Sequence, residues 1–169
     1  MLKNFYPSLI LNDIYEIDID KLKKNNITLL IFDIDNTLVP YHEPNASERI
    51  LSYMKNLEDH GFSVALVSNN RAERVEKFNQ SLSLFHVASA MKPFKRGLKH
   101  VMRHFNATKQ STAIIGDQIF TDVYGGNRLG VFTILVTPIE RKEGLFFRFK
   151  RRMEEIVINH MKKRKKTNE

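Results

Sequence analysis

Short apolar runs alternate along the chain with segments whose apolar residues recur every three or four positions. The runs are rich in β-branched residues and bounded by polar ones, which is typical of buried strands. They cover residues 27–32, 63–67, 112–115 and 131–136, with a weaker one at 87–88. The periodic segments predict helices at about 48–60, 71–80, 94–105 and 121–130. This alternation predicts an α/β fold: three layers, with a parallel sheet covered by helices on both faces.

The flanking segments complete the expected organisation. Residues 1–26 predict an irregular or partly helical lead-in, and Asn45 followed by Glu48 predicts a helix start of the capping-box kind. In the helix at 94–105 we expect Phe94, Leu98 and Val101 to share one buried face. Because no linker or repeat interrupts the chain, we expect residues 1–169 to form a single domain with its core at about 27–140.

Composition narrows the class of protein. The chain is 42% hydrophobic, enough for a packed core, and the absence of cysteine excludes disulfides and thiolate metal sites. No apolar run reaches the ~18 residues of a membrane-spanning helix, and the first residues lack a signal-peptide pattern. We therefore expect a cytoplasmic location. The net charge of +8, concentrated towards the end of the chain, favours an anionic partner such as a phosphate, a nucleic acid or an acidic membrane. A soluble basic protein without such a partner is the alternative.

Polar side chains follow four of the predicted strands at the point where each strand ends. These residues are Asp33 and Asp35, then Ser68, then Lys92, then Asp117 and Asp122. Because the carboxyl ends of parallel strands lie at one edge of a sheet, we expect them to meet there. Asp, Asn and Thr are also ordinary turn residues, so any one position alone carries little weight.

Together, these side chains suit phosphoryl transfer. A carboxylate can attack phosphorus and form an aspartyl-phosphate, and a second can protonate the leaving oxygen and later deprotonate water. A hydroxyl and a lysine can hold the phosphate oxygens. Because the attacking carboxylate and the phosphate repel each other, a divalent cation is needed, and oxygen ligands favour Mg²⁺.

The sequence resembles the haloacid dehalogenase (HAD) superfamily of phosphatases in four motifs. They are Asp33-Ile34-Asp35-Asn36-Thr37, Ser68-Asn69-Asn70, Lys92-Pro93 and Gly116-Asp117-Gln118-Ile119-Phe120-Thr121-Asp122. The resemblance implies a HAD-like Rossmannoid fold in which Asp33 is the nucleophile and Asp35 the general acid and base. It implies phosphate binding by Ser68, Asn69 and Lys92.

The same resemblance implies a Mg²⁺ site. Its ligands would be the Asp33 side chain, the Asp35 main-chain carbonyl and Asp117, with Asp122 orienting the site through water. One predicted helix nearly fills each interval between Asp33, Ser68 and Lys92, which leaves no room for an inserted cap domain. We therefore expect an open site that suits a large or surface-bound phosphate ester.

Further matching segments resemble the YqeG family of subclass IIIA, which is similar to the mitochondrial phosphatidylglycerophosphate phosphatases of yeast and plants. They are residues 36–39, 68–70, 116–118, 121–128 and 133–136. The resemblance implies hydrolysis of phosphatidylglycerophosphate to phosphatidylglycerol. Two alternatives stay open: a phosphatase for a soluble, protein or nucleic-acid phosphate, and an RNA- or ribosome-binding module with the same fold.

Residues 145–165 have the pattern of a basic amphipathic helix. Apolar residues such as Phe149, Ile156 and Val157 recur at helical spacing, and lysines and arginines surround them. Such a helix can lie on an anionic bilayer, which would make the protein peripheral on the inner face of the membrane. It can equally pack on the domain and leave its charges in water.

Overall fold

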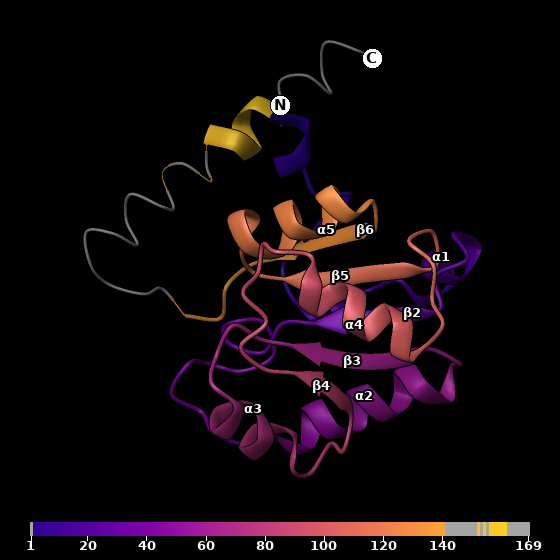
Figure 1. Ribbon diagram of the computed structural model, residues 1–169, viewed down its shortest axis with the longest axis vertical. Coiled ribbons are helices and arrows are strands. Elements are labelled where there is room, and N and C mark those ends of the chain that lie inside the picture. The colour runs from indigo at the N-terminus through magenta and orange to yellow at the C-terminus, as the bar shows by residue number, and fades with distance from the viewer. Residues whose placement is uncertain (1, 141–151, 153, 155, 162–169) are drawn as a thin grey trace.

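The computed structural model describes residues 2–140, 152, 154 and 156–161. Its centre is a parallel sheet of six strands in the order β1-β6-β5-β2-β3-β4 (Figure 1). The strands are β1 (Leu9–Leu11), β2 (Leu29–Phe32), β3 (Ser63–Val67), β4 (Phe85–Val87), β5 (Thr112–Gly116) and β6 (Phe132–Val136). The predicted parallel α/β fold is confirmed, and the bounds of β2 to β6 lie within about two residues of the predicted ones.

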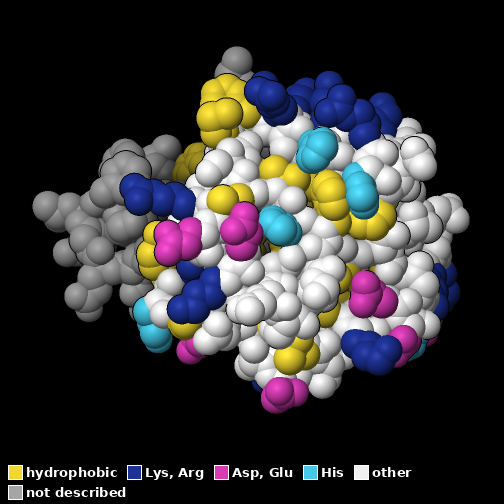
Figure 2. Space-filling view, turned by 60° about the horizontal axis from the view of Figure 1, so that its bottom comes forward, with side chains coloured by type: hydrophobic (Ala, Val, Ile, Leu, Met, Phe, Trp, Pro, Cys, Tyr) yellow, Lys and Arg dark blue, Asp and Glu magenta, His cyan; other side chains and the backbone are white. Residues whose placement is uncertain are grey.

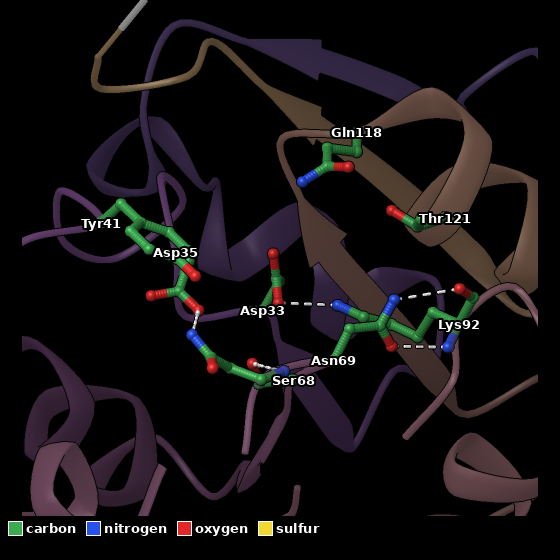
Figure 3. Close-up of a pocket in the computed structure, with 9 residues that line it drawn as sticks. Asp33, Asp35, Tyr41, Ser68, Asn69, Lys92, Gln118 and Thr121 are labelled. Atoms are coloured by element: carbon green, nitrogen blue, oxygen red, sulfur yellow. Dashed lines mark hydrogen bonds and ion pairs between the residues drawn. The ribbon is translucent and has the colours of Figure 1, made fainter. Parts of the chain in front are cut away.

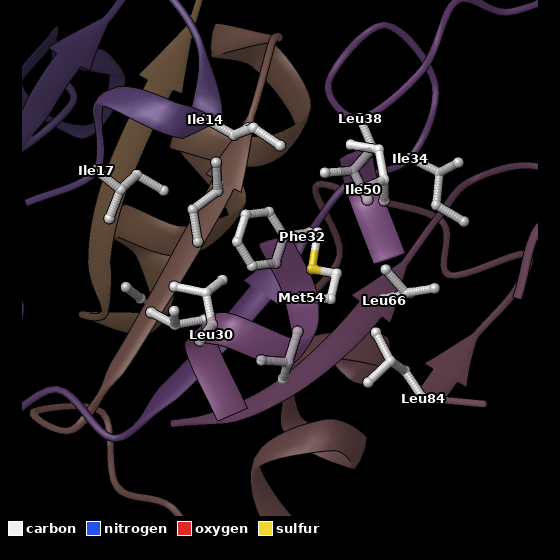
Figure 4. Close-up of a cluster of buried hydrophobic side chains, with 14 of the residues drawn as sticks. Ile14, Ile17, Leu30, Phe32, Ile34, Leu38, Ile50, Met54, Leu66 and Leu84 are labelled. Atoms are coloured by element: carbon white, nitrogen blue, oxygen red, sulfur yellow. The ribbon is translucent and has the colours of Figure 1, made fainter. Parts of the chain in front are cut away.

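Helices cover both faces of the sheet. They are α1 (Ile19–Lys24), α2 (Glu48–Asp59), α3 (Ala72–Asn79), α4 (Arg96–His104) and α5 (Tyr124–Leu129), with short turns η1 (Leu2–Phe5), η2 (Ile14–Glu16) and η3 (Ile119–Val123). Side chains alternate along β2: Leu30 and Phe32 pack in the cluster under α2 and α3 (Figure 4), whereas Leu29 and Ile31 pack in the cluster under α4. Because both faces of β2 are covered, the whole strand is apolar.

The N-terminal segment belongs to the sheet. Strand β1 pairs in parallel with β6, and Ile14, Ile17 and Leu22 are buried in the same cluster as Phe32. The prediction of a partly helical lead-in missed β1, which is only three residues long and pairs with β6, a strand far away in the sequence. The division of the chain into a single domain stays a prediction.

Two local predictions were wrong. The N-cap of α2 is Ser47, whose hydroxyl accepts a hydrogen bond from the Ile50 N–H at 3.4 Å, so Asn45 does not cap this helix. Phe94 lies before α4 and is 64% exposed, so it is outside the buried face that Leu98 and Val101 form. The reason is that the chain turns at Pro93, and α4 begins only at Arg96.

The predicted absence of a cap domain is confirmed between Asp33 and Lys92, an interval that the structure describes in full. A loop of residues 33–47 joins β2 to α2, and residues 68–71 join β3 to α3. Most of the predicted helix at 145–165 lies outside the described residues. Its described part is helical at 156–161 and buries Val157 and Met161, and Val157 packs with Ile119 and Val123. In the described part of the chain, no helix is long and apolar enough to cross a bilayer.

Candidate active site

The loop after β2 places the first two carboxylates at the carboxyl edge of the sheet. The Asp33 N–H donates to the Ile115 carbonyl at 2.9 Å, which fixes the start of the loop against β5. Asn36 has φ of 65°, a left-handed conformation that Asn tolerates better than most residues. Its side-chain amide exchanges two hydrogen bonds of 3.3 Å with the main chain of Glu140. The sharp turn therefore directs Asp33 and Asp35 towards the same side of the sheet.

An open cavity of about 230 Å³ lies at this edge. Its lining residues come from four strand ends: Asp33, Asp35, Tyr41, Ser68, Asn69, Asn70, Lys92, Gln118 and Thr121. Figure 3 shows Asp33 in the middle, with Asp35 on one side and Lys92 on the other. The structure thus brings together all five residues predicted for catalysis and phosphate binding.

Lys92 lies between two buried carboxylates. Its Nζ is 2.7 Å from Asp33 Oδ1 and 2.7 Å from Asp122 Oδ1. Burial of Lys92 favours its neutral amine, but the charges of Asp122 and Asp33 outweigh this effect and raise the pKa of Lys92. The side chain is therefore a permanent ammonium ion held beside the predicted nucleophile.

Asp33 has an unusual pKa for a carboxyl group. Burial raises the pKa of Asp33 from 3.8 to about 6; the Lys92 charge opposes the rise and the Asp122 charge adds to it. The group is still mostly ionised at neutral pH, as a nucleophile must be. A cation bound to Asp33 would favour the ionised form further.

Three buried carboxylates can hold a metal ion. One oxygen each of Asp33, Asp117 and Asp122 lies within 4.8 Å of the others. Lys92 contacts two of the three and carries one positive charge, which cannot balance three buried negative charges. A hard divalent cation such as Mg²⁺ fits both the oxygen donors and the charge. Asp35 contributes no carboxylate oxygen to this group. This agrees with the expectation that Asp35 would bind the metal through its main-chain carbonyl.

Asp122 depends on the glycine at the end of β5. A Cβ atom on Gly116 would lie 2.3 Å from Asp122 Cγ and 2.4 Å from its Oδ2. The π-helical turn η3 brings Asp122 back towards β5, where Oδ2 accepts hydrogen bonds from the Gln118 N–H and the Thr121 hydroxyl. Both oxygens of Asp122 thus have partners within the protein, which suits its predicted contact with the metal through water.

Asp35 pairs with a residue that the sequence analysis missed. Arg74, on α3, donates from Nη2 to Asp35 Oδ1 at 3.1 Å, and Asn70 Nδ2 donates to Oδ2 at 3.2 Å. The same guanidinium also donates to the carbonyls of Glu43 and Pro44. Arg74 therefore fixes both the second carboxylate and the loop that carries it. Its sequence signal is weak: an arginine one helical turn after the Ser68 motif, on a charged helix.

Ser68 and Asn69 have different surroundings. The Ser68 hydroxyl accepts a hydrogen bond from the Asn70 N–H at 3.0 Å, so it can donate its own proton to a phosphate oxygen. The Asn69 amide instead makes two hydrogen bonds to the main chain of Lys92, at 2.6 and 3.0 Å. In this structure Asn69 positions the loop of residues 88–95, called the lysine loop because it carries Lys92. Its contact with phosphate stays a prediction.

The lysine loop also rests on α5. A Cβ atom on Gly125 would lie 3.3 Å from Pro93 Cα, and one on Gly126 would lie 2.6 Å from methyl groups of Ile114 and Thr133. Tight helix–strand packing therefore accounts for Gly126. Gly125 lets Pro93, next to Lys92, approach the helix closely.

Comparisons with known proteins identify a family of phosphatases. A family profile described as Mitochondrial PGP phosphatase matches residues 2–140. Probable phosphatase YqeG of Bacillus subtilis (strain 168) is 37% identical over 165 residues, which cover 97% of this chain and 96% of that protein. Phosphatidylglycerophosphate phosphatase 1, chloroplastic/mitochondrial, of Arabidopsis thaliana is 27% identical over 158 residues. Those residues cover 88% of this chain but 45% of the plant protein, so the chain spans about half of its length.

Solved structures agree with the fold. The cobalt-bound deoxy-D-mannose-octulosonate 8-phosphate phosphatase of Haemophilus influenzae superposes with a TM-score of 0.52 and is 19% identical. The match covers 81% of this chain and 90% of that one. An uncharacterized protein of Listeria monocytogenes serotype 4b gives a TM-score of 0.54 at 21% identity, covering 69% of this chain and 85% of that one. At these identities the likeness concerns the fold.

Proposed function

The chain belongs to the YqeG-like HAD phosphatases of subclass IIIA, related to the mitochondrial PGP phosphatases, and we propose that it hydrolyses phosphatidylglycerophosphate to phosphatidylglycerol. One observation carries the chemistry. A buried carboxylate, Asp33, faces an open cavity between a second carboxylate, Asp35, and a buried ammonium ion, Lys92. A group of three carboxylates that suits a divalent cation includes the same Asp33.

In the first half of the reaction, an Asp33 oxygen attacks phosphorus. The bond between phosphorus and the glycerol oxygen breaks as the Asp33–phosphorus bond forms. Asp35 gives its proton to the departing oxygen, and Lys92 and the Ser68 hydroxyl hold the phosphate oxygens. When bound, Mg²⁺ reduces the repulsion between the Asp33 carboxylate and the phosphate.

In the second half, water replaces Asp33. Asp35, now ionised, takes a proton from a water molecule, whose oxygen attacks phosphorus. The bond between Asp33 and phosphorus breaks, inorganic phosphate leaves, and both carboxylates return to their starting states. Arg74 and Asn70 hold Asp35 in place between the two steps.

Three observations support a lipid substrate. Among the residues that the structure describes, no cap domain covers the site, so the head group of a lipid can enter while its chains stay in the bilayer. The plant relative and the matching family profile are both named for this substrate. The chain carries a net charge of +8, which favours binding to an anionic surface. We place the protein at the cytoplasmic face of a membrane as a peripheral enzyme.

The test is phosphate release from phosphatidylglycerophosphate in vesicles, with Mg²⁺ and with EDTA. We expect Mg²⁺-dependent release that Asp33→Asn abolishes and the surface variant Lys55→Gln leaves unchanged, since Lys55 is exposed on α2. Release that persists in Asp33→Asn would contradict the mechanism. Faster turnover of a soluble sugar or nucleotide phosphate than of the lipid would keep the mechanism and refute the substrate.

A further inference from the structure

Acidic residues are absent from one long stretch of the chain. Between Glu76 and Asp117 the sequence contains no Asp or Glu. The same stretch holds seven basic residues: Lys77, Lys92, Lys95, Arg96, Lys99, Arg103 and Lys109. Four of them lie on or next to α4, the helix that begins shortly after the site residue Lys92. No acidic residue on α4 therefore offsets the charge of these four side chains.

The α4 charges face water. Arg96, Lys99 and Arg103 are exposed and fall on one side of the helix, three and four residues apart. Among the described residues, no ion pair involves them or Lys95. Figure 2 shows a row of Lys and Arg side chains along one margin of the molecule, with an exposed hydrophobic group directly beside it. These charges are free to meet an anionic surface.

Exposed apolar side chains gather at the edge of the sheet that carries the site. In the described part of the chain, six large hydrophobic residues are exposed, and four follow strand ends at this edge: Tyr41, Met91, Phe94 and Ile139. Met91 is 58% exposed and Phe94 is 64% exposed, and they flank Lys92-Pro93. Met91 also has φ of 53°, a conformation that costs free energy in a residue other than glycine. Scattered single exposures need no explanation, but a concentration at the site does.

We propose that Met91, Phe94, Lys95, Arg96, Lys99 and Arg103 form a docking surface for an anionic phospholipid bilayer. The inference rests on the proposed lipid substrate and adds the surface through which the site meets it. Met91 and Phe94 enter the boundary of the acyl chains, while the α4 charges bind lipid phosphates. Because both apolar residues flank Lys92, docking brings head groups to the mouth of the cavity that contains Asp33.

A hollow beside α4 can hold a neighbouring head group. It has a volume of about 360 Å³, and its lining includes Arg96, His100, Arg103 and residues 87–91. RNA is the other macromolecule that a basic face could bind. A bilayer fits better because Met91 has no aromatic face on which a base could stack, yet is nearly as exposed as Phe94.

The test measures vesicle binding without substrate, so its result is independent of the proposed reaction. The full chain is floated with phosphatidylcholine vesicles, alone or with phosphatidylglycerol added. The charge variant is Arg96→Gln/Lys99→Gln/Arg103→Gln, and the apolar variant is Met91→Ser/Phe94→Ser. The matched control is Lys21→Gln/Lys23→Gln/Lys24→Gln, which removes the same number of positive charges from exposed positions on α1. Helix α1 precedes the first residue of β2, whereas the site follows the last residue of that strand.

Each basic residue at an anionic surface strengthens binding about fivefold, so we expect the charge variant to bind phosphatidylglycerol vesicles about a hundredfold more weakly. The apolar variant should lose about tenfold, and the control less than threefold. Hydrolysis of a soluble aryl phosphate should be unchanged in all three. Equal losses in charge variant and control, or a charge variant that loses binding to single-stranded RNA but keeps vesicle binding, would overturn the proposal.

Discussion

Replacing Lys92 by Met should produce a destabilisation that depends on pH. Raising the pKa of Asp33 from 3.8 to about 6 means that the ionised group already costs the folded protein about 3 kcal/mol. Lys92 is 2.7 Å from both Asp33 and Asp122 and limits this cost. Without it, two buried carboxylates face each other, and removing one partner of a buried pair costs about 3–5 kcal/mol.

The sign of the pH dependence follows from the direction of the shift. A carboxyl group whose pKa is raised by folding stabilises the protein below its unfolded pKa, and that contribution is lost as pH rises through the folded pKa. In the variant, the pKa of Asp33 rises above 6. We therefore expect Lys92→Met to lose about 3–5 kcal/mol at pH 8, but only about 1–2 kcal/mol at pH 5, where Asp33 is protonated.

Urea denaturation in EDTA at pH 5 and pH 8 measures both values. Lys99→Met is the control, because it removes an exposed charge and should change the free energy of unfolding by less than about 0.5 kcal/mol at either pH. An equal loss at the two pH values would refute the reasoning. It would mean that Lys92 contributes through packing rather than through its charge.

Three further predictions concern the site. Gly116→Ala should displace Asp122, lower the free energy of unfolding by about 1–3 kcal/mol and weaken Mg²⁺ binding, measured by denaturation and calorimetry; unchanged Mg²⁺ affinity would contradict it. Arg74→Ala should free Asp35 and lower kcat by about 10- to 100-fold with little change in KM for an aryl phosphate; a loss confined to KM would refute this role. Because Asp33 must lose its proton to bind a cation, Mg²⁺ affinity should fall as pH drops from 7 to 5, and Asp33→Asn should remove that dependence.

The sequence predicted the sheet and the principal site well. Apolar runs such as residues 29–32 and 112–116 are covered on both faces, so they carry an unbroken signal that does not depend on distant residues. The four motifs end these strands, and the parallel topology brings them to one edge. Hence the sequence alone predicts that Asp33, Asp35, Ser68 and Lys92 lie together.

The features that the sequence did not predict correctly have one cause in common. Arg74 reaches Asp35 only because of the way α3 packs against the loop after β2. No local sequence pattern predicts that contact. Strand β1 gains its hydrogen bonds from β6, more than a hundred residues later in the chain. Phe94 fits the period of α4 but precedes the helix, because Pro93 turns the chain first. Each outcome was decided by tertiary contacts.

The central claim is that Asp33 forms a covalent bond to phosphorus, and the most direct measurement is mass analysis of the acid-quenched enzyme. An aryl phosphate serves as substrate, because its leaving group needs no proton from Asp35. Asp35→Asn should then form the phosphoenzyme and hydrolyse it slowly, so that one phosphoryl group accumulates on the peptide containing Asp33. Asp33→Asn/Asp35→Asn should carry none. A phosphoryl group on any other peptide, or its presence in the double variant, would contradict the account.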